Sequence, residues 1–115
     1  MHIEWEKVKI YVKPGPTDMR KQINGLSVIV KEDIGIDPFT GHLFIFCNKP
    51  RNRLKVLYWD KNGFCLWLKR LEKHKFPWPK NREGVLELKE KELRMLLGGI
   101  DFFQAHQEIT YEKVC

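Results

Sequence analysis

The chain has 115 residues, 43% of them hydrophobic and 31% charged, which is the composition of one ordinary globular domain. Its net charge of +6 at pH 7 points toward an anionic partner. The first residues lack the features of a signal peptide, and no apolar run approaches the roughly 18 residues that a membrane helix needs. We therefore expect one cytoplasmic domain over residues 1–115, with no membrane association.

The N-terminal third predicts a strand followed by a helix. Residues 8–12 alternate in polarity and meet Pro14-Gly15-Pro16, the pattern of a strand closed by a turn. Thr17 or Asp18 can then cap a helix, which we expect to run to about Lys31. Apolar residues recur at helical spacing along it, at Met19, Ile23, Leu26 and Val30.

The middle of the chain predicts a three-stranded meander. Residues 42–47 form a nearly continuous apolar run, typical of a central strand, and residues 54–60 and 64–71 flank a hairpin signal at Asp60-Lys61-Asn62-Gly63. Two registers stay open at this point. A two-residue turn would set Tyr58 opposite Trp67, whereas a glycine bulge would set Trp59 opposite Cys65 and Lys55 opposite Lys69.

The last third predicts a loop, a short strand and a helix. Residues 72–80 are rich in charge and proline, so we expect an extended surface loop there. Residues 85–88 have the pattern of a short strand, and residues 89–97 that of a helix that stops at Gly98-Gly99. The sequence thus predicts an α+β fold: a small single domain with an antiparallel meander sheet, an N-terminal strand-helix unit and a short C-terminal helix.

The positive charge lies almost wholly in the middle of the chain. Residues 49–82 hold eleven Lys or Arg against two Asp or Glu, whereas residues 1–48 hold six against six and residues 83–115 four against seven. Such segregation is typical of a surface that binds the phosphates of a nucleic acid. The alternative is a solvated hairpin whose lysines keep its edge from pairing.

Aromatic residues are interleaved with these cations. Exposed aromatics can stack on bases, so Tyr58, Trp59, Trp67 and Trp78 are candidates for stacking or for a protein interface. Tryptophans in a small domain more often belong to its core, and that interpretation stays open for Trp59 and Trp67.

The sequence matches none of the common patterns for catalytic or metal-binding sites. Cys47, Cys65 and Cys115 form no C-x-x-C pair, and the four histidines share no ligand spacing, so we expect reduced thiols, no metal and no cofactor. Strand-transfer chemistry needs converging carboxylates, but the basic segment 49–82 contains only Asp60 and Glu72. We therefore expect a protein that is not an enzyme.

Several motifs match one known family. They are Gly15-Pro16-Thr17-Asp18-Met19-Arg20-Lys21, Leu43-Phe44-Ile45-Phe46 with Asn48, Tyr58-Trp59-Asp60, Gly63-Phe64-Cys65-Leu66-Trp67, Lys69-Arg70-Leu71-Glu72, Trp78-Pro79 and Gly99-Ile100-Asp101. From about Val8 to Asp101 the chain resembles the TnpB accessory proteins of bacterial insertion sequences of family sixty-six. It departs from that pattern at Cys47, Lys49-Pro50 and Leu68, and residues 102–115 match nothing in it.

The resemblance implies a non-catalytic accessory protein for DNA transposition, which works with a separately encoded transposase that carries the acidic catalytic residues. It brings no active site within this chain. Together with the charge, it favours contact with transposon-end or target DNA. The candidate DNA-binding residues are Arg20, Lys21, Lys49, Arg51, Arg53, Lys55, Lys69, Arg70, Lys73 and Lys75.

Two other functions stay open. An adaptor would bind the transposase through the aromatic hairpin without touching DNA. An enzyme would need metal-dependent chemistry at carboxylates such as Asp18 or Asp60. Neither the accessory role nor the adaptor role requires a small-molecule substrate.

Overall fold

The computed structural model describes residues 3–80 and 84–99. Five strands form one mixed sheet in the order β4-β3-β2-β1-β5. The strands are β1 (Ile10–Val12), β2 (Leu43–Cys47), β3 (Arg53–Asp60), β4 (Gly63–Arg70) and β5 (Leu86–Leu88). The helices are α1 (Ile23–Val28), a π-helical continuation η1 (Ile29–Ile34), a 3-10 turn η2 (Pro38–Thr40) and α2 (Glu90–Leu97).

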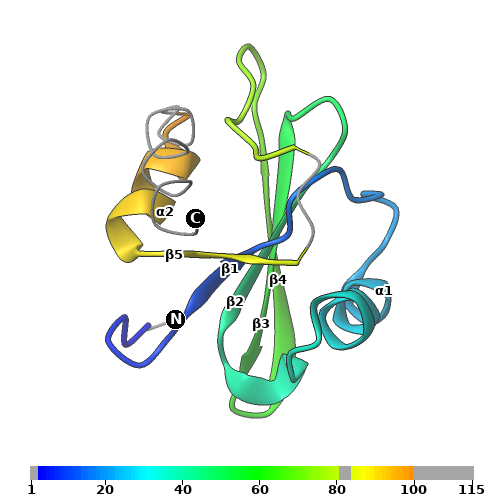
Figure 1. Ribbon diagram of the computed structural model, residues 1–115, viewed down its shortest axis with the longest axis vertical. Helices are drawn as coiled ribbons and strands as arrows, with labels where there is room; N and C mark the ends of the chain where they lie inside the picture. The colour runs from blue at the N-terminus through cyan, green and yellow to red at the C-terminus, as the bar shows by residue number, and fades with distance from the viewer. Residues whose placement is uncertain (1–2, 81–83, 100–115) are drawn as a thin grey trace, which may run out of the picture.

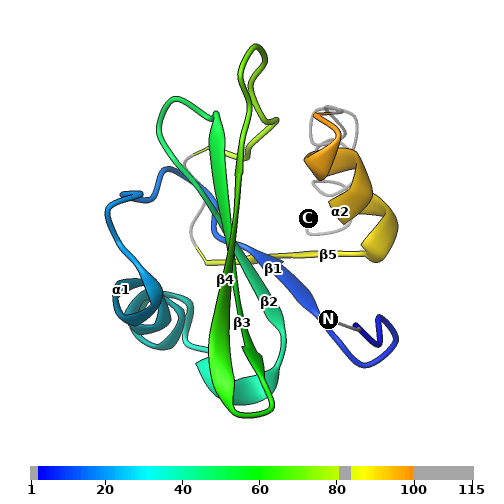
Figure 2. The ribbon, with the colours of Figure 1, turned by 180° about the vertical axis from the view of Figure 1, so that it is seen from behind.

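The two α-helices cover opposite faces of the sheet (Figures 1 and 2). Because successive side chains of a strand point to opposite faces, β2 contributes to both cores. The core on the α2 face includes Leu43, Ile45, Leu54, Val56, Leu93 and Leu96. The core on the α1 face consists of Leu26, Ile29, Val30, Phe44, Phe46 and Leu57. Burial on both faces makes β2 the central strand, as its apolar run predicts.

The expected α+β fold is confirmed, and so is the meander. β2 pairs with β3 and β3 with β4, all antiparallel. The prediction did not assign a partner to the first strand, and β1 lies parallel to β2. The helical segment α1–η1 connects these two strands, and such a crossover connection is what parallel neighbours require. The short strand β5 then adds antiparallel to β1.

The first helix begins later and ends later than predicted. Neither Thr17 nor Asp18 caps it, because the Asp18 carboxylate accepts hydrogen bonds from the backbone and side chain of Arg20 instead. The stretch before Ile23 stays irregular because the ammonium of Lys55 binds its carbonyl oxygens. Lys55 Nζ lies 2.8 Å from both Met19 O and Lys21 O. The helix then runs past Lys31 to Ile34.

Both proposed hairpin registers are wrong. Asp60 pairs with Gly63, Trp59 with Phe64 and Tyr58 with Cys65. The two turn residues are therefore Lys61 and Asn62, one position earlier than an Asn-Gly turn would give. Lys61 takes the left-handed conformation with φ 51°. Asn-Gly is only a local preference, and here the regular ladder from Arg53–Arg70 to Asp60–Gly63 prevails over it.

The expected surface loop at 72–80 is only half correct. Residues 72–75 are exposed, but residues 76–79 are buried, with Phe76 fully enclosed. The prolines do extend this segment, and the extended chain lies against the α2-face core as a strap. We call residues 76–79 the strap below.

Lys55 should stabilise the fold through its hydrogen bonds rather than through its charge. Lys55→Met keeps the buried stem but leaves the carbonyls of Met19 and Lys21 without their donor. We expect the free energy of unfolding to fall by about 2–3 kcal/mol, since each of the two part-buried acceptors that loses its donor costs about 1 kcal/mol or somewhat more. Urea unfolding measures this. Lys73→Met, at an exposed site, should change stability by less than about 0.5 kcal/mol; equal losses in the two variants would contradict the role of Lys55.

Cys47 should be inert in the folded protein. Burial raises the pKa of its thiol to about 12, so almost no thiolate forms at pH 8. We expect iodoacetamide to modify the partly exposed Cys65 in the native state and Cys47 only in denaturant. Peptide mass analysis after labelling distinguishes the two sites. Rapid native labelling of Cys47 would show that the strands around it open readily.

Candidate nucleic-acid interface

Three loops meet at one end of the sheet, the end drawn at the top of Figure 1. They follow β1, connect β2 to β3, and lead from β4 into the strap. Direct hydrogen bonds join them: Gly15 N donates to Pro79 O at 2.9 Å, and Phe76 N donates to Arg51 O at 2.7 Å. The strap is thereby fixed to both other loops, which gives this end a defined surface.

Asn48 organises the loop between β2 and β3. Its side-chain oxygen accepts from the backbone N–H of Asn52 at 3.0 Å and of Arg53 at 3.1 Å, and its amide donates to Asn52 Oδ1 at 2.7 Å. The resulting turn holds Arg51 at φ 62°, a left-handed conformation that is unfavourable for arginine. The loop therefore presents Arg51 in one particular backbone geometry.

A basic groove lies where these loops meet. Its volume is about 390 Å³, and it is lined by Gly15, Pro16, Asn48, Lys49, Arg51, Lys75, Trp78, Pro79 and Lys80. Four of the lining residues are cations and none is a carboxylate. Trp78 is itself buried, so the groove offers positive charge over a rigid apolar floor.

Further cations flank the groove. Arg53 and Arg70 face each other at the end of the β3–β4 ladder, and Lys73 lies in the loop after β4. The one carboxylate among these residues, Glu72, accepts from Arg70 Nη2 at 2.9 Å, an exposed pair of little energetic weight. We call Lys49, Arg51, Arg53, Arg70, Lys73, Lys75 and Lys80 the basic end.

Four candidate DNA-binding cations lie outside the basic end. Lys55 is only 5% exposed and its ammonium is bound to carbonyl oxygens, so it cannot reach a phosphate. Lys69 Nζ donates to the carbonyl of Leu97 at the end of α2. Arg20 and Lys21 are exposed before α1, and Arg20 is paired with Asp18 at 2.7 Å. That pairing holds the pKa of Asp18 at about 2.

The structure does not bring the candidate aromatics to the basic end as an exposed set. Trp78 is 6% exposed, and its Nε1 donates to Gly15 O at 2.9 Å, so it packs rather than stacks on a ligand. Trp59 lies near the β3–β4 turn, edge-on to Phe39 and Phe64 with ring centroids 5.0 Å away in each case.

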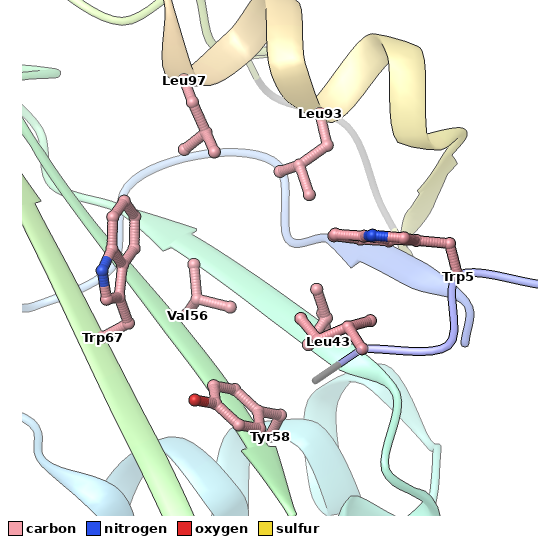
Figure 3. Close-up of a pocket in the computed structure, with 8 residues that line it drawn as sticks. Trp5, Leu43, Val56, Tyr58, Trp67, Leu93 and Leu97 are labelled. Atoms are coloured by element: carbon pink, nitrogen blue, oxygen red, sulfur yellow. The ribbon is translucent and has the colours of Figure 1, made fainter. Parts of the chain in front are cut away.

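Tyr58 and Trp67 instead line an apolar pocket on the α2 face. Leu93 and Leu97 reach down from α2 into this pocket, while Trp5 and Trp67 stand on opposite sides of it (Figure 3). Its volume is about 180 Å³, and Ile3, Leu43 and Val56 complete it. Burial raises the pKa of Tyr58 to about 12, with a contribution from its hydrogen bond to Cys65.

Some residues of these sites could not be assigned to them from the sequence alone. Lys80 lines the groove but was not among the predicted DNA-binding residues. The high density of cations around Trp78-Pro79 could have indicated it. Asn48 was seen only as part of a motif, because its role depends on two backbone N–H groups that the turn brings to it. Trp5 has no periodic neighbours that would have placed it beside α2.

Over 3–80 and 84–99, no three His, Cys, Asp or Glu side chains lie close enough together to hold a metal ion. No helix described in these ranges has the length and apolar character needed to cross a bilayer.

Comparison with known proteins identifies the family. Residues 8–107 match the model of the family described as IS66 Orf2 like protein. The chain belongs to the IS66 Orf2-like family. The match extends beyond Asp101, where the residue-by-residue resemblance ended, so part of the C-terminal tail belongs to the family pattern as well.

Two relatives come from Sinorhizobium fredii. The uncharacterized protein y4hO is 35% identical over 97 residues, covering 84% of each chain. The uncharacterized protein y4jC is 36% identical over 95 residues, covering 83% of this chain and 81% of its own. No solved structure matches the chain. Membership of the IS66 Orf2-like family makes this protein a transposition accessory protein of an insertion sequence, in a family that is accessory rather than catalytic.

The basic end should lose its shape when Asn48 is truncated. Asn48→Ala removes the acceptor for the N–H groups of Asn52 and Arg53, and we expect the free energy of unfolding to fall by about 1–3 kcal/mol. Thermal unfolding measures this. The neighbouring Lys49→Ala, at an exposed site, should be nearly neutral in the same assay; if the two variants were equally stable, the loop would not depend on Asn48.

Proposed function

We propose that this protein assists transposition by contacting the DNA backbone through its basic end. The observation that carries the proposal is the convergence of three loops, distant in sequence, on a groove lined by Lys49, Arg51, Lys75 and Lys80 without a carboxylate. Phosphate is the ligand that such a surface favours, because each cation set against it releases condensed counterions.

The type of contact follows from the residues present. The cations of the basic end are long side chains on loops and strand ends, exposed except for the half-buried Arg51, and the aromatic side chains that could read or stack bases lie elsewhere or are buried. The basic end therefore suits contacts to phosphates, which position a protein on a duplex but carry little sequence information. Arg51 and Arg70 can each bind one phosphate through two N–H groups.

The chemistry of transposition belongs, in this proposal, to a separately encoded transposase, and this chain is not an enzyme. The carboxylates of the loops that meet at the basic end support this division. Glu72 is bound to Arg70, and Asp18 is bound to Arg20, so both act as ion-pair partners rather than as a cluster that could hold metal ions.

The apolar pocket on the α2 face supports a second, compatible role as an adaptor. Trp5, Trp67, Leu93 and Leu97 offer a concave surface without charge, and interfaces are commonly anchored by large apolar side chains seated in such pockets. A transposase side chain could occupy it. Binding there would change little with salt, whereas phosphate contact would weaken steeply.

A charge-matched pair of triple variants tests the DNA contact. Lys49→Gln, Arg51→Gln and Lys75→Gln together remove three charges from the groove. We expect affinity for a transposon-end duplex to fall about tenfold or more at low salt, and the slope of log affinity against log salt to become shallower by about 2–3, roughly one unit for each lost phosphate contact. Fluorescence anisotropy over a salt series gives both quantities.

The matched control combines Lys9→Gln, Lys31→Gln and Lys91→Gln. It removes the same net charge from three exposed positions, which lie just before β1, on η1 and on α2 respectively. It should keep most of the affinity. Equal weakening in both triple variants would show that only net charge matters, and unchanged binding of the groove variant would contradict the proposal. A scrambled duplex of equal length should bind similarly if phosphates dominate.

A further inference from the structure

Strand β4 forms an exposed edge of the sheet. In the described part of the chain it pairs with β3 alone, and in Figure 2 it is the strand nearest the viewer with nothing in front of it. In an antiparallel ladder every second residue directs its backbone N–H and C=O away from the paired strand. Along β4, four residues therefore offer these groups to another strand.

This edge lacks the features that usually prevent strand pairing. Soluble proteins block long edges with charge, proline or bulges. The first six residues of β4, from Gly63 to Leu68, contain none of these, and the ladder with β3 is regular throughout. Trp67 is 43% exposed and Leu68 is 54% exposed, on opposite faces of the same edge. Such an edge is suited to a partner strand.

We propose that a second copy of this chain pairs with β4, antiparallel to it, to form a ten-stranded sheet across a two-fold axis. The distribution of charge favours this orientation. Lys69 and Arg70, the cations of β4, lie at the C-terminal end of the strand. Asp60 lies at the other end, on β3, where it pairs with Gly63. Parallel pairing would set Lys69 and Arg70 of the two copies together, and these like charges would repel. Antiparallel pairing instead sets them beside the turn of the other copy, where Asp60 and Lys61 balance each other.

The register follows from the faces of the sheet. A two-fold axis perpendicular to the sheet places side chains of the same face opposite each other. Centring the pair on Leu66 sets Leu68 of each copy against Phe64 of the other, and Cys65 against Trp67. Both exposed apolar side chains of β4 are then covered.

The arrangement has a geometric consequence, which rests on the proposed DNA contact. The basic ends lie beyond the carboxyl ends of the two β4 strands and so at opposite ends of the combined sheet. At about 3.3 Å per residue, roughly six residues on either side of Leu66 separate them by about 40 Å. One turn of B-DNA spans about 34 Å, so the dimer could contact one duplex at two places a turn apart.

The first experiment measures the mass of the full chain without DNA, by sedimentation over a range of concentrations at moderate salt, which screens the net charge of +6 on each copy. The mass should rise from 13.8 kDa toward twice that value. Leu68→Lys should remain monomeric at concentrations about tenfold above those at which the wild type dimerises, equivalent to a loss of about 1.4 kcal/mol.

Val28→Lys is the matched control, because Val28 is 56% exposed and lies on α1 rather than on the edge. It should dimerise like the wild type. A wild type that stays monomeric, as it would if β4 received a strand of the transposase instead, overturns the proposal. So does equal dimerisation of both variants. The measurement contains no DNA, so its result is independent of whether the basic end binds phosphates.

Disulfide trapping tests the register and does not depend on how Leu68→Lys folds. In a Cys115→Ser background, Trp67→Cys should form a covalent dimer on mild oxidation, joined between Cys65 of one copy and the introduced thiol at position 67 of the other. Non-hydrogen-bonded antiparallel pairs bring such residues within disulfide reach. Val28→Cys in the same background should not form it. A link between other positions would refute the Leu66-centred register.

Discussion

The hydrogen bonds between Gly15 and the strap hold together the end of the molecule on which its proposed function depends. Gly15 donates its N–H to Pro79 O, and its carbonyl accepts the indole N–H of Trp78, which lies 63 residues away in sequence. Only glycine readily takes the φ of 77° found there between two prolines. This junction fixes the loop after β1 to the strap, and the bond from Phe76 N to Arg51 O fixes the strap to the β2–β3 loop. The four groove cations, Lys49, Arg51, Lys75 and Lys80, therefore lie on connected loops. The fold thus turns a scattered positive charge into a surface.

Much of the fold could be predicted from local patterns. Every strand in the described residues lies where alternation or a continuous apolar run predicted it, and β2 is central because its side chains are apolar in both directions. The errors arose where tertiary contacts prevail over local preference. Lys55 lies 33 or more residues from the carbonyls that it binds, so nothing in residues 17–22 shows that the helix must start late. The hairpin turn shifted for a similar reason.

The candidate site was predicted less well than the fold. Charge counting found the segment that supplies the four cations of the groove, but it could not separate cations that serve the fold from those that are free. Lys55 and Lys69 satisfy carbonyl oxygens, a role that depends on where β3 and β4 lie relative to the loop before α1 and to α2. Likewise, Trp78 had the appearance of a stacking residue, and burial of the strap made it part of the core.

The backbone of Arg51 illustrates a conflict between stability and activity. A left-handed conformation costs a non-glycine residue roughly 1–2 kcal/mol, and glycine or asparagine would relieve most of it. The loop nevertheless holds arginine there, at the edge of a groove that needs cations. Replacing it with glycine would therefore be expected to give a more heat-resistant protein that is less able to hold a polyanion. A search for stabilised variants of this chain would reach that position early, and would weaken the proposed DNA contact while improving the fold.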